Sequence, residues 1–143
     1  MSILAAQKPV APTNVVRTFA DQTSISIQWT EPLYNGNTPL TAYNIYWDNA
    51  SGVLLSTAVG TTSATTLTFS ITGLTTNRYY TFAVTAVNII GESSQATSSP
   101  IITATVPGQP SKPSLISQSK TSLNIGWSDP NNLGGTSLTG YKI

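Results

Sequence analysis

The side chains that could carry chemistry in this sequence are few, and they are carboxylates. Histidine and cysteine are both absent, which removes the usual general bases, most nucleophiles and the common transition-metal ligands. Two carboxylates at a suitable separation could hydrolyse a glycosidic bond, and two at one loop cluster could bind calcium. Which of them can meet depends on the elements that hold them. The carboxylates in the first 106 residues are Asp21, Glu31, Asp48 and Glu92.

The elements that must position these carboxylates are predicted to be short strands. In residues 23–30, Ile25, Ile27 and Trp29 alternate with polar side chains, as in a half-buried strand. Turn-forming segments separate further runs of this kind, and no segment has a helical period. Short strands separated by turns predict an all-β sandwich. Six further strands are expected, of which 52–59 would lie at a sheet edge: 15–20, 41–48, 52–59, 66–71, 79–88 and 99–106.

A sandwich assigns the carboxylates to its two ends. Glu31 follows strand 23–30, whereas Asp48 ends strand 41–48, which runs back to the other end. One strand separates the ends by about 17–20 Å, so these two carboxylates cannot act as a pair. Glu31 and Glu92 are expected at the same end, where a weak calcium site is one interpretation and two solvated loop carboxylates the other. The sequence therefore predicts a protein that is not an enzyme and has no cofactor.

The sequence also repeats itself at an offset of 98 residues. Trp29 falls on Trp127, and Tyr43 falls on Tyr141. At this offset residues 1–45 align with 99–143 without a gap, and fifteen of the forty-five positions are identical. Self-similarity at a fixed period indicates a repeat architecture.

The repeat divides the chain into three parts. Residues 1–8 would be a linker or the end of the last strand of a preceding repeat. Residues 9–106 would form one complete domain, and residues 107–143 the first part of another, its strands A to C. The chain is thus expected to be a window on a tandem array. Trp127 and Tyr141 would then have little to pack on.

The residues of these repeats resemble a known family. An opening Pro-x-x-Pro is followed by "SISIQW" and "EP", then by "NGNTPLTAYNIYW" and "ITGLTTNRYYTFAVTAVNIIGES". These segments are similar to a fibronectin type III domain, which implies a seven-stranded immunoglobulin-like β-sandwich. Leu74 and Tyr80 match the family's tyrosine corner, in which the hydroxyl bonds back to the turn backbone. Asn77 and Arg78 depart from the Gly and Thr that the family often has there.

The resemblance and the alternation together predict core and loop residues. The predicted structural core contains Trp29, Tyr43, Leu74, Tyr80 and Phe82. The B–C loop (32–39) and the F–G loop (88–94) would share one end of the sandwich, where immunoglobulin-like folds often bind partners. A second interpretation is that these loop tips fold onto their own domain or meet the neighbouring one. The candidate interaction residues in the loops are Tyr34, Asn35, Asn37, Asn88, Ile90 and Glu92.

The low charge of the chain and the lack of a long apolar run restrict the kinds of partner that it could bind. Charged residues make up 8% of the chain against a usual share of about a quarter, and the net charge is +1. Such a surface has no electrostatic attraction for nucleic acid. No apolar run is long enough for a membrane span in this segment. The sequon Asn49-Ala50-Ser51 predicts a possible N-glycosylation site at Asn49.

The function that these features favour is structural. We expect a non-catalytic structural and adhesion module of a tandem array, acting as a spacer and a scaffold for protein–protein interaction. Neighbouring repeats of the same chain would be its first partners, with a further protein partner unidentified, and the location would be extracellular or at the cell surface. Two alternatives remain open: an intracellular scaffold of the cytoskeletal or muscle type, and an accessory module of a secreted carbohydrate-active enzyme.

Overall fold

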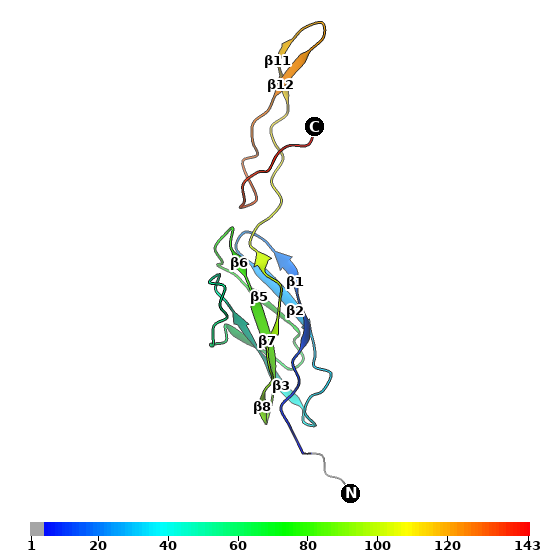
Figure 1. Cartoon of the computed structure of the whole chain (residues 1–143), viewed down its shortest axis with the longest axis vertical. Coiled ribbons are helices and arrows are strands. Elements are labelled where there is room, and N and C mark those ends of the chain that lie inside the picture. Colours follow the sequence, from blue (N-terminus) through cyan, green and yellow to red (C-terminus); the bar gives the residue numbers. More distant parts are fainter. Residues whose placement is uncertain (1–4) are drawn as a thin grey trace.

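The computed structural model describes residues 5–143 and shows an all-β chain (Figure 1). The predicted β-sandwich is confirmed, and residues 107–143 extend from the end of the sandwich opposite to the N-terminal chain. Of the strand end expected over residues 1–8, residues 1–4 lie outside the described residues, and 5–8 belong to no strand. The strands of the sandwich are β1 (Thr13–Ala20), β2 (Ile25–Thr30), β3 (Leu40–Trp47), β4 (Gly60–Ser63), β5 (Thr68–Ile71), β6 (Tyr79–Tyr80), β7 (Phe82–Asn88), β8 (Gly91–Glu92), β9 (Ala96–Thr97) and β10 (Ile101–Ile102).

The first sheet contains three antiparallel strands in the order β1-β2-β5. Strand β2 is the centre of this sheet, and its residues alternate between the core and the outer face, as its sequence predicts. Ile25 pairs with Ile71 and Ile27 with Phe69 across β2 and β5. The apolar period of two is therefore what sets the register of this sheet.

The second sheet has the order β4-β3-β7-β8, with β9 also paired to β7. Its central pair is β3 with β7, paired from Leu40 opposite Asn88 to Trp47 opposite Phe82 with one register shift between Leu40 and Ala42. The last strand of the sandwich is interrupted: β9 pairs with β7, and β10 pairs with β6 after Pro100. Proline cannot donate to a ladder, so an interruption at this position has a simple cause.

Three predicted strands differ from the observed ones by more than a few residues at their ends. The strand predicted over 79–88 is divided into β6, which pairs with β10, and β7, which pairs with β3. The edge strand lies at β4 rather than at 52–59, where Val53 is 70% exposed. The chain that follows β3 first forms a turn, in which Asp48 accepts hydrogen bonds from the amides of Ala50 and Ser51. The edge strand therefore begins later in the sequence than predicted. The strand predicted over 99–106 is reduced to β10, because from Thr105 the backbone bonds to a different part of the chain.

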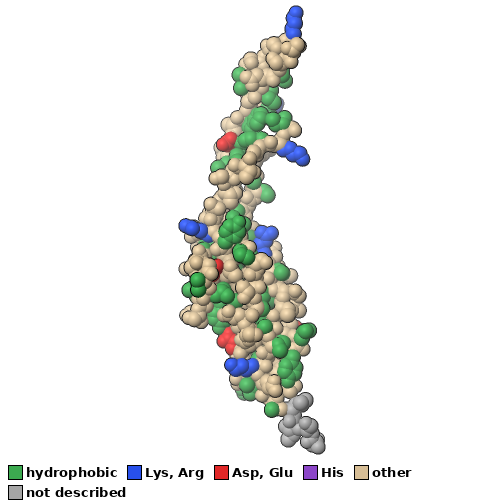
Figure 2. Space-filling model, in the orientation of Figure 1, with side chains coloured by type: hydrophobic (Ala, Val, Ile, Leu, Met, Phe, Trp, Pro, Cys, Tyr) green, Lys and Arg blue, Asp and Glu red, His purple; other side chains and the backbone are tan. Residues whose placement is uncertain are grey.

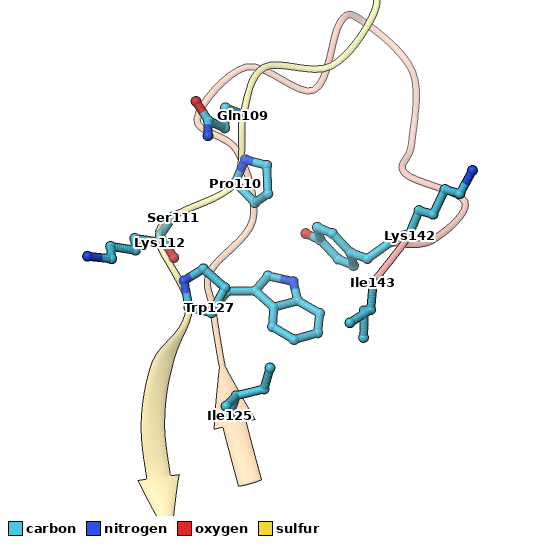
Figure 3. A pocket seen from close by; sticks show the side chains of 10 residues that line it. Gln109, Pro110, Ser111, Lys112, Ile125, Trp127, Lys142 and Ile143 are labelled. Atoms are coloured by element: carbon cyan, nitrogen blue, oxygen red, sulfur yellow. The ribbon is translucent and has the colours of Figure 1, made fainter. Parts of the chain in front are cut away.

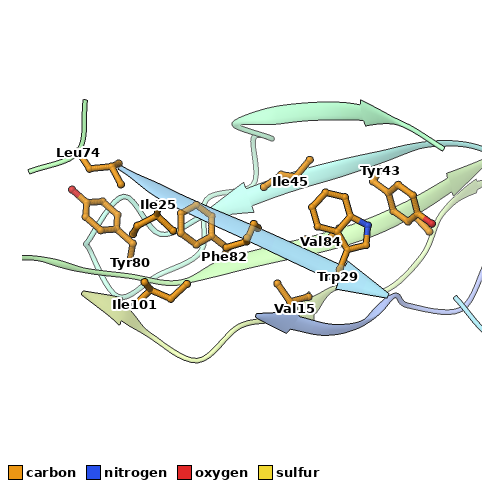
Figure 4. Packing of buried hydrophobic residues seen from close by; sticks show 12 residues of the cluster. Val15, Ile25, Trp29, Tyr43, Ile45, Leu74, Tyr80, Phe82, Val84 and Ile101 are labelled. Carbon is orange, nitrogen blue, oxygen red and sulfur yellow. The ribbon is translucent and has the colours of Figure 1, made fainter. Parts of the chain in front are cut away.

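Large side chains from both sheets fill the core (Figure 4). Trp29 and Tyr43 meet edge to face with ring centroids 5.4 Å apart. Edge-to-face packing is a favoured arrangement of aromatic rings, and burying each such side chain contributes roughly 1.5–3 kcal/mol. All five side chains expected in the structural core are buried: Trp29, Tyr43, Leu74, Tyr80 and Phe82.

The turn before β6 is held by a tyrosine. The hydroxyl of Tyr80 accepts a hydrogen bond of 2.9 Å from the amide of Thr75, which is the bond that the tyrosine-corner resemblance implies. Asn77 occupies the left-handed region with φ of 58°, where the family often has glycine. Asparagine adopts this conformation more readily than most residues, so the departure from the family pattern is tolerated.

Residues 107–143 contain one hairpin, formed by β11 (Ser114–Gln118) and β12 (Leu123–Gly126). Its apolar side chains are largely open to solvent; Ile116 is 65% and Leu123 67% exposed. The division of the chain at residues 9 and 107, with strands A to C in the last part, stays a prediction.

Candidate functional site: the two ends of the sandwich

Asn88 organises the end of the sandwich where the N-terminal chain enters. Its side chain is buried, and its Nδ2 donates to the carbonyls of Gln7 (2.6 Å) and Asn35 (2.9 Å). Its Oδ1 accepts from the amides of Ile90 (2.9 Å) and Gly91 (3.1 Å). These four bonds use the whole hydrogen-bonding capacity of the amide. Asn88 was predicted as an interaction residue, but its side chain connects three segments within the domain and has no free donor or acceptor.

Glu92 is also engaged within the domain. Its carboxylate accepts hydrogen bonds from the Thr85 hydroxyl, from Tyr46 Oη at 2.6 Å and from Asn44 Nδ2 at 3.2 Å. Burial acts to raise the pKa of Glu92, but the three hydrogen bonds and the nearby charge of Lys8 outweigh it and leave the pKa below its ordinary value. Glu92 is therefore bonded to side chains of β3 and β7 in the second sheet, and the interaction role expected of it stays a prediction.

The calcium interpretation has no support from the arrangement of the acids. Within residues 5–143, His, Cys, Asp and Glu form no group of three or more that could hold a metal ion. Glu31 is exposed, whereas Glu92 accepts the three hydrogen bonds described above.

The N-terminal chain lies along the B–C loop. The amide of Gln7 donates to the carbonyl of Gly36 at 2.8 Å, and that of Val10 to the carbonyl of Tyr34 at 3.1 Å. Gly36 and Asn37 both have positive φ, 82° and 58°. A Cβ at Gly36 would overlap the Gln7 carbonyl oxygen, so the close approach of the two segments requires glycine there.

Apolar side chains are exposed at this same end. Tyr34 and Ile90, predicted as loop tips, are 38% and 47% exposed. Leu33 and Ile89 were not predicted, yet they are 94% and 80% exposed. Their signal in the sequence was available, because each is a large apolar residue beside a turn-forming residue, Pro32 or Asn88. A cluster of exposed apolar side chains commonly marks an interaction surface.

Two predicted loop residues lie beside these tips. Asn35 and Asn37 are both exposed, and the Asn35 Oδ1 accepts from the Asn37 amide at 3.1 Å. The Asn37 Nδ2 reaches the Ala5 carbonyl at 3.4 Å. Both side chains thus support the loop while facing solvent.

The opposite end of the sandwich is joined to the C-terminal segment. The amide of Thr105 donates to the Gly134 carbonyl at 2.8 Å, and within the C-terminal segment the amide of Gly108 donates to the Asn132 carbonyl at 2.8 Å. Gln22 Nε2 donates to Asn132 Oδ1 at 3.0 Å. Sequence reasoning missed the Gln22–Asn132 contact, since no local pattern links positions 110 residues apart. We call this set of contacts the joint.

A cleft in the C-terminal segment lies between Pro110, Ile125, Trp127 and Ile143 (Figure 3). Trp127 and Tyr141 pack edge to face in it, with centroids 5.3 Å apart. This pair lies 98 residues after the buried pair of Trp29 and Tyr43. The aromatic pair in this cleft is therefore the sequence counterpart of a pair in the core of the sandwich.

Charge is sparse on the surface. Figure 2 shows few basic and acidic side chains on a mostly neutral surface. Across the part of the chain that the structure describes, no helix is long and apolar enough to cross a membrane. Asn49 is exposed in the turn after β3, and its glycosylation stays a prediction.

Comparison with known proteins identifies relatives of very different kinds. The family model described as fibronectin type III domain matches residues 10–104. Exoglucanase B of Cellulomonas fimi is 33% identical over 142 residues, which cover 94% of this chain and 12% of that protein. M-protein of striated muscle from Gallus gallus is 31% identical over 140 residues, covering 94% of this chain and 9% of that protein. The chain thus spans about a tenth of the length of these relatives.

A solved structure matches the fold as well. Domains A168–A170 of titin align with a TM-score of 0.62 and 27% identity, over 68% of this chain and 33% of that one. The shared sandwich is therefore found among consecutive domains of titin.

Proposed function

The chain belongs to the fibronectin type III family, and on that premise we propose that it acts as a non-catalytic spacer and protein-interaction scaffold within a tandem array of such domains. The observation that carries this proposal is the joint. The Gln22 side chain donates to Asn132, and the Thr105 amide donates to the Gly134 carbonyl, so hydrogen bonds connect the C-terminal segment to the end of the sandwich. A spacer must transmit position from one unit to the next, and a hydrogen-bonded connection does so.

Proline strengthens the same connection. Pro107 and Pro110 lie in the segment between β10 and β11, where each fixes its own φ and restricts the residue before it. A short segment of this composition is semi-rigid and extended. Together with the joint it would hold successive units in line.

The first partners in this proposal are neighbouring repeats of the same chain, and a further protein partner would bind the array. We propose that the protein acts in adhesion and is located at the cell surface or outside the cell. The exposed sequon at Asn49 supports this location. The likeness to Exoglucanase B favours a second candidate, an accessory module of a secreted carbohydrate-active enzyme. The likeness to muscle M-protein favours an intracellular scaffold as a third.

Mass spectrometry of the native protein from its source tests the proposal. We expect a mass well above the 15.1 kDa of this chain, with further peptides that repeat the 98-residue pattern. A glycan on Asn49 would support the extracellular location, and a catalytic domain in the same chain would favour the accessory role. A native mass of 15.1 kDa would contradict the array.

A further inference from the structure

One backbone contact occurs at both ends of the sandwich. At the joint, the Thr105 amide donates to the Gly134 carbonyl; 98 residues earlier, the Gln7 amide donates to the Gly36 carbonyl, and both bonds measure 2.8 Å. The glycines share more than the bond. Both have positive φ, and a Cβ on either would overlap the carbonyl oxygen of its partner, Thr105 or Gln7. The N-terminal chain is therefore held as the chain at the joint is held.

A second contact repeats at the same offset. The Gly108 amide donates to the Asn132 carbonyl at 2.8 Å, and the Val10 amide to the Tyr34 carbonyl at 3.1 Å. Two bonds in the same register mean that the loop at 130–135 and the loop at 32–37 hold the entering chain with equivalent backbone atoms. The loop at 130–135 is seated against a sandwich, through Asn132 and Gln22.

The equivalent seat of the first loop is on a unit that precedes Pro9. We propose that the B–C and F–G end of residues 9–106, which we call the entry face, is the docking surface for the preceding fibronectin type III unit of the same chain. That unit would present the turns equivalent to 21–24, between β1 and β2, and 72–78, between β5 and β6. In the same way residues 9–106 present Gln22 and Thr76 to the C-terminal segment. This inference rests on the proposed array. The entry face consists of Leu33, Tyr34, Asn37, Ile89 and Ile90.

The chemistry of the entry face fits such a partner. Its exposed apolar side chains include Leu33 and Ile89, which are the most exposed of the set. The other surface of the joint is neutral, and it combines the amide of Gln22 with the hydroxyl and methyl groups of Thr76. Apolar tips against a neutral turn surface need no charge pairing, in keeping with the sparse charge of the chain.

The joint also indicates how one unit is matched to the next. Gly135 lies so close to Thr76 that an added Cβ would fall 2.5 Å from the Thr76 methyl carbon. The Thr76 hydroxyl donates to the Gln22 carbonyl at 2.8 Å, which holds that rotamer. The counterpart of Gly135 is Asn37, which carries a Cβ. A unit that docks on the entry face must therefore lack the methyl group at the position of Thr76, as Ser, Ala or Gly would.

Cysteine cross-linking tests this pairing, because the chain has no cysteine of its own. A second copy of residues 9–104 replaces residues 1–6 of the chain, so that Ala104 of the upstream copy continues into Gln7. Cysteines replace Gln22 of the upstream copy and Tyr34 of the downstream copy, and a short bismaleimide links them. The existing joint supplies the reference pair, Gln22→Cys with Asn132→Cys in the unextended chain. The background linking rate comes from a pair with Gln22→Cys in the upstream copy and Ser51→Cys in the downstream copy.

The upstream Thr76→Ser variant is the decisive one, because it keeps the hydroxyl bond and removes only the methyl group. With it we expect the Gln22–Tyr34 pair to link about as fast as the reference pair and at least about tenfold faster than background, through its higher effective concentration. With Thr76 retained, linking should be several-fold slower.

Two results would overturn the inference. Linking of the Gln22–Tyr34 pair at the background rate, with both copies folded by tryptophan fluorescence, would remove the docking surface. Equal, fast linking with Thr76 and with Thr76→Ser would remove the matching rule. Neither result would contradict the proposed array, because repeats that are joined but free to turn would still form a long chain. The array is tested separately by the mass of the native protein.

Discussion

Trp29 and Tyr43 contact each other in the core, yet within residues 5–143 neither the Trp29 indole nitrogen nor the Tyr43 hydroxyl has a hydrogen-bond partner. Burial, followed by the charge of Glu31, raises the pKa of Tyr43. The 98-residue counterpart differs, since the Tyr141 hydroxyl donates to Asp129 at 2.5 Å. In the first unit Tyr43 therefore contributes the packing of its ring to the core, whereas its buried hydroxyl contributes no hydrogen bond.

Removal of that hydroxyl should be harmless. We expect Tyr43→Phe to leave the free energy of unfolding unchanged or to raise it slightly, because a buried unpaired polar group costs stability. Tyr80→Phe is the matched control, since it leaves the Thr75 amide without its acceptor and should cost about 1–3 kcal/mol. Denaturant unfolding followed by tryptophan fluorescence measures both. Equal losses in the two variants would contradict the unpaired state of Tyr43.

The glycine of the B–C loop should be irreplaceable for a reason beyond its φ. Gly52 has φ of 78° and open space around it, so Gly52→Ala should cost about 1–2 kcal/mol of backbone strain alone. Gly36→Ala adds the overlap with the Gln7 carbonyl and should cost more. It should also free the Gln7 amide, which amide hydrogen exchange would detect. A loss no larger than that of Gly52→Ala would show that the entering chain moves aside without cost.

Asn88 allows its donor and acceptor roles to be separated. Asn88→Asp keeps an oxygen acceptor for the amides of Ile90 and Gly91 but loses the donor to the carbonyls of Gln7 and Asn35. We expect a loss of about 1–3 kcal/mol, because two carbonyls lose their shared donor beside a new charge. Exchange should accelerate at the Gln7 amide and stay slow at the Ile90 amide. Uniform acceleration across both loops would indicate general loosening instead.

Stability should depend on acid through Glu92. Its folded-state pKa lies below the ordinary value, so its bonds stabilise the fold above the unfolded-state pKa and are lost as the pH falls through the folded one. Glu92→Gln should therefore be less stable than the parent at neutral pH, and the difference should shrink below about pH 4. Glu31→Gln, at an exposed carboxylate, controls for the loss of one charge. A difference that is independent of pH would contradict this assignment.

Much of the sandwich is predictable because its sequence is locally consistent. The alternation around Ile25, Ile27 and Trp29 specifies which face of β2 is buried, and the observed burial follows it. The Tyr80 bond follows from the family resemblance of the turn before it. The edge strand was misplaced because an exposed edge has no apolar period to mark it, and a turn at Asp48 displaced it along the chain.

The ends of the sandwich were harder to predict. Asn88 and Glu92 are polar residues in or beside a loop, and nothing local distinguishes an exposed side chain from one that is satisfied internally. Their partners, among them Gln7 and Tyr46, are distant in sequence. The joint depends in the same way on a contact between Gln22 and Asn132, which only the folded chain brings together.

The joint is made chiefly of backbone atoms, and this has a geometric consequence. An amide and a carbonyl are present in almost every residue, so the Thr105–Gly134 bond can recur at each junction while side chains diverge. Applying one head-to-tail operation again and again generates screw symmetry. An array of such units would be a gently winding rod, and a partner that binds along it would meet equivalent faces at a pitch set by the joint.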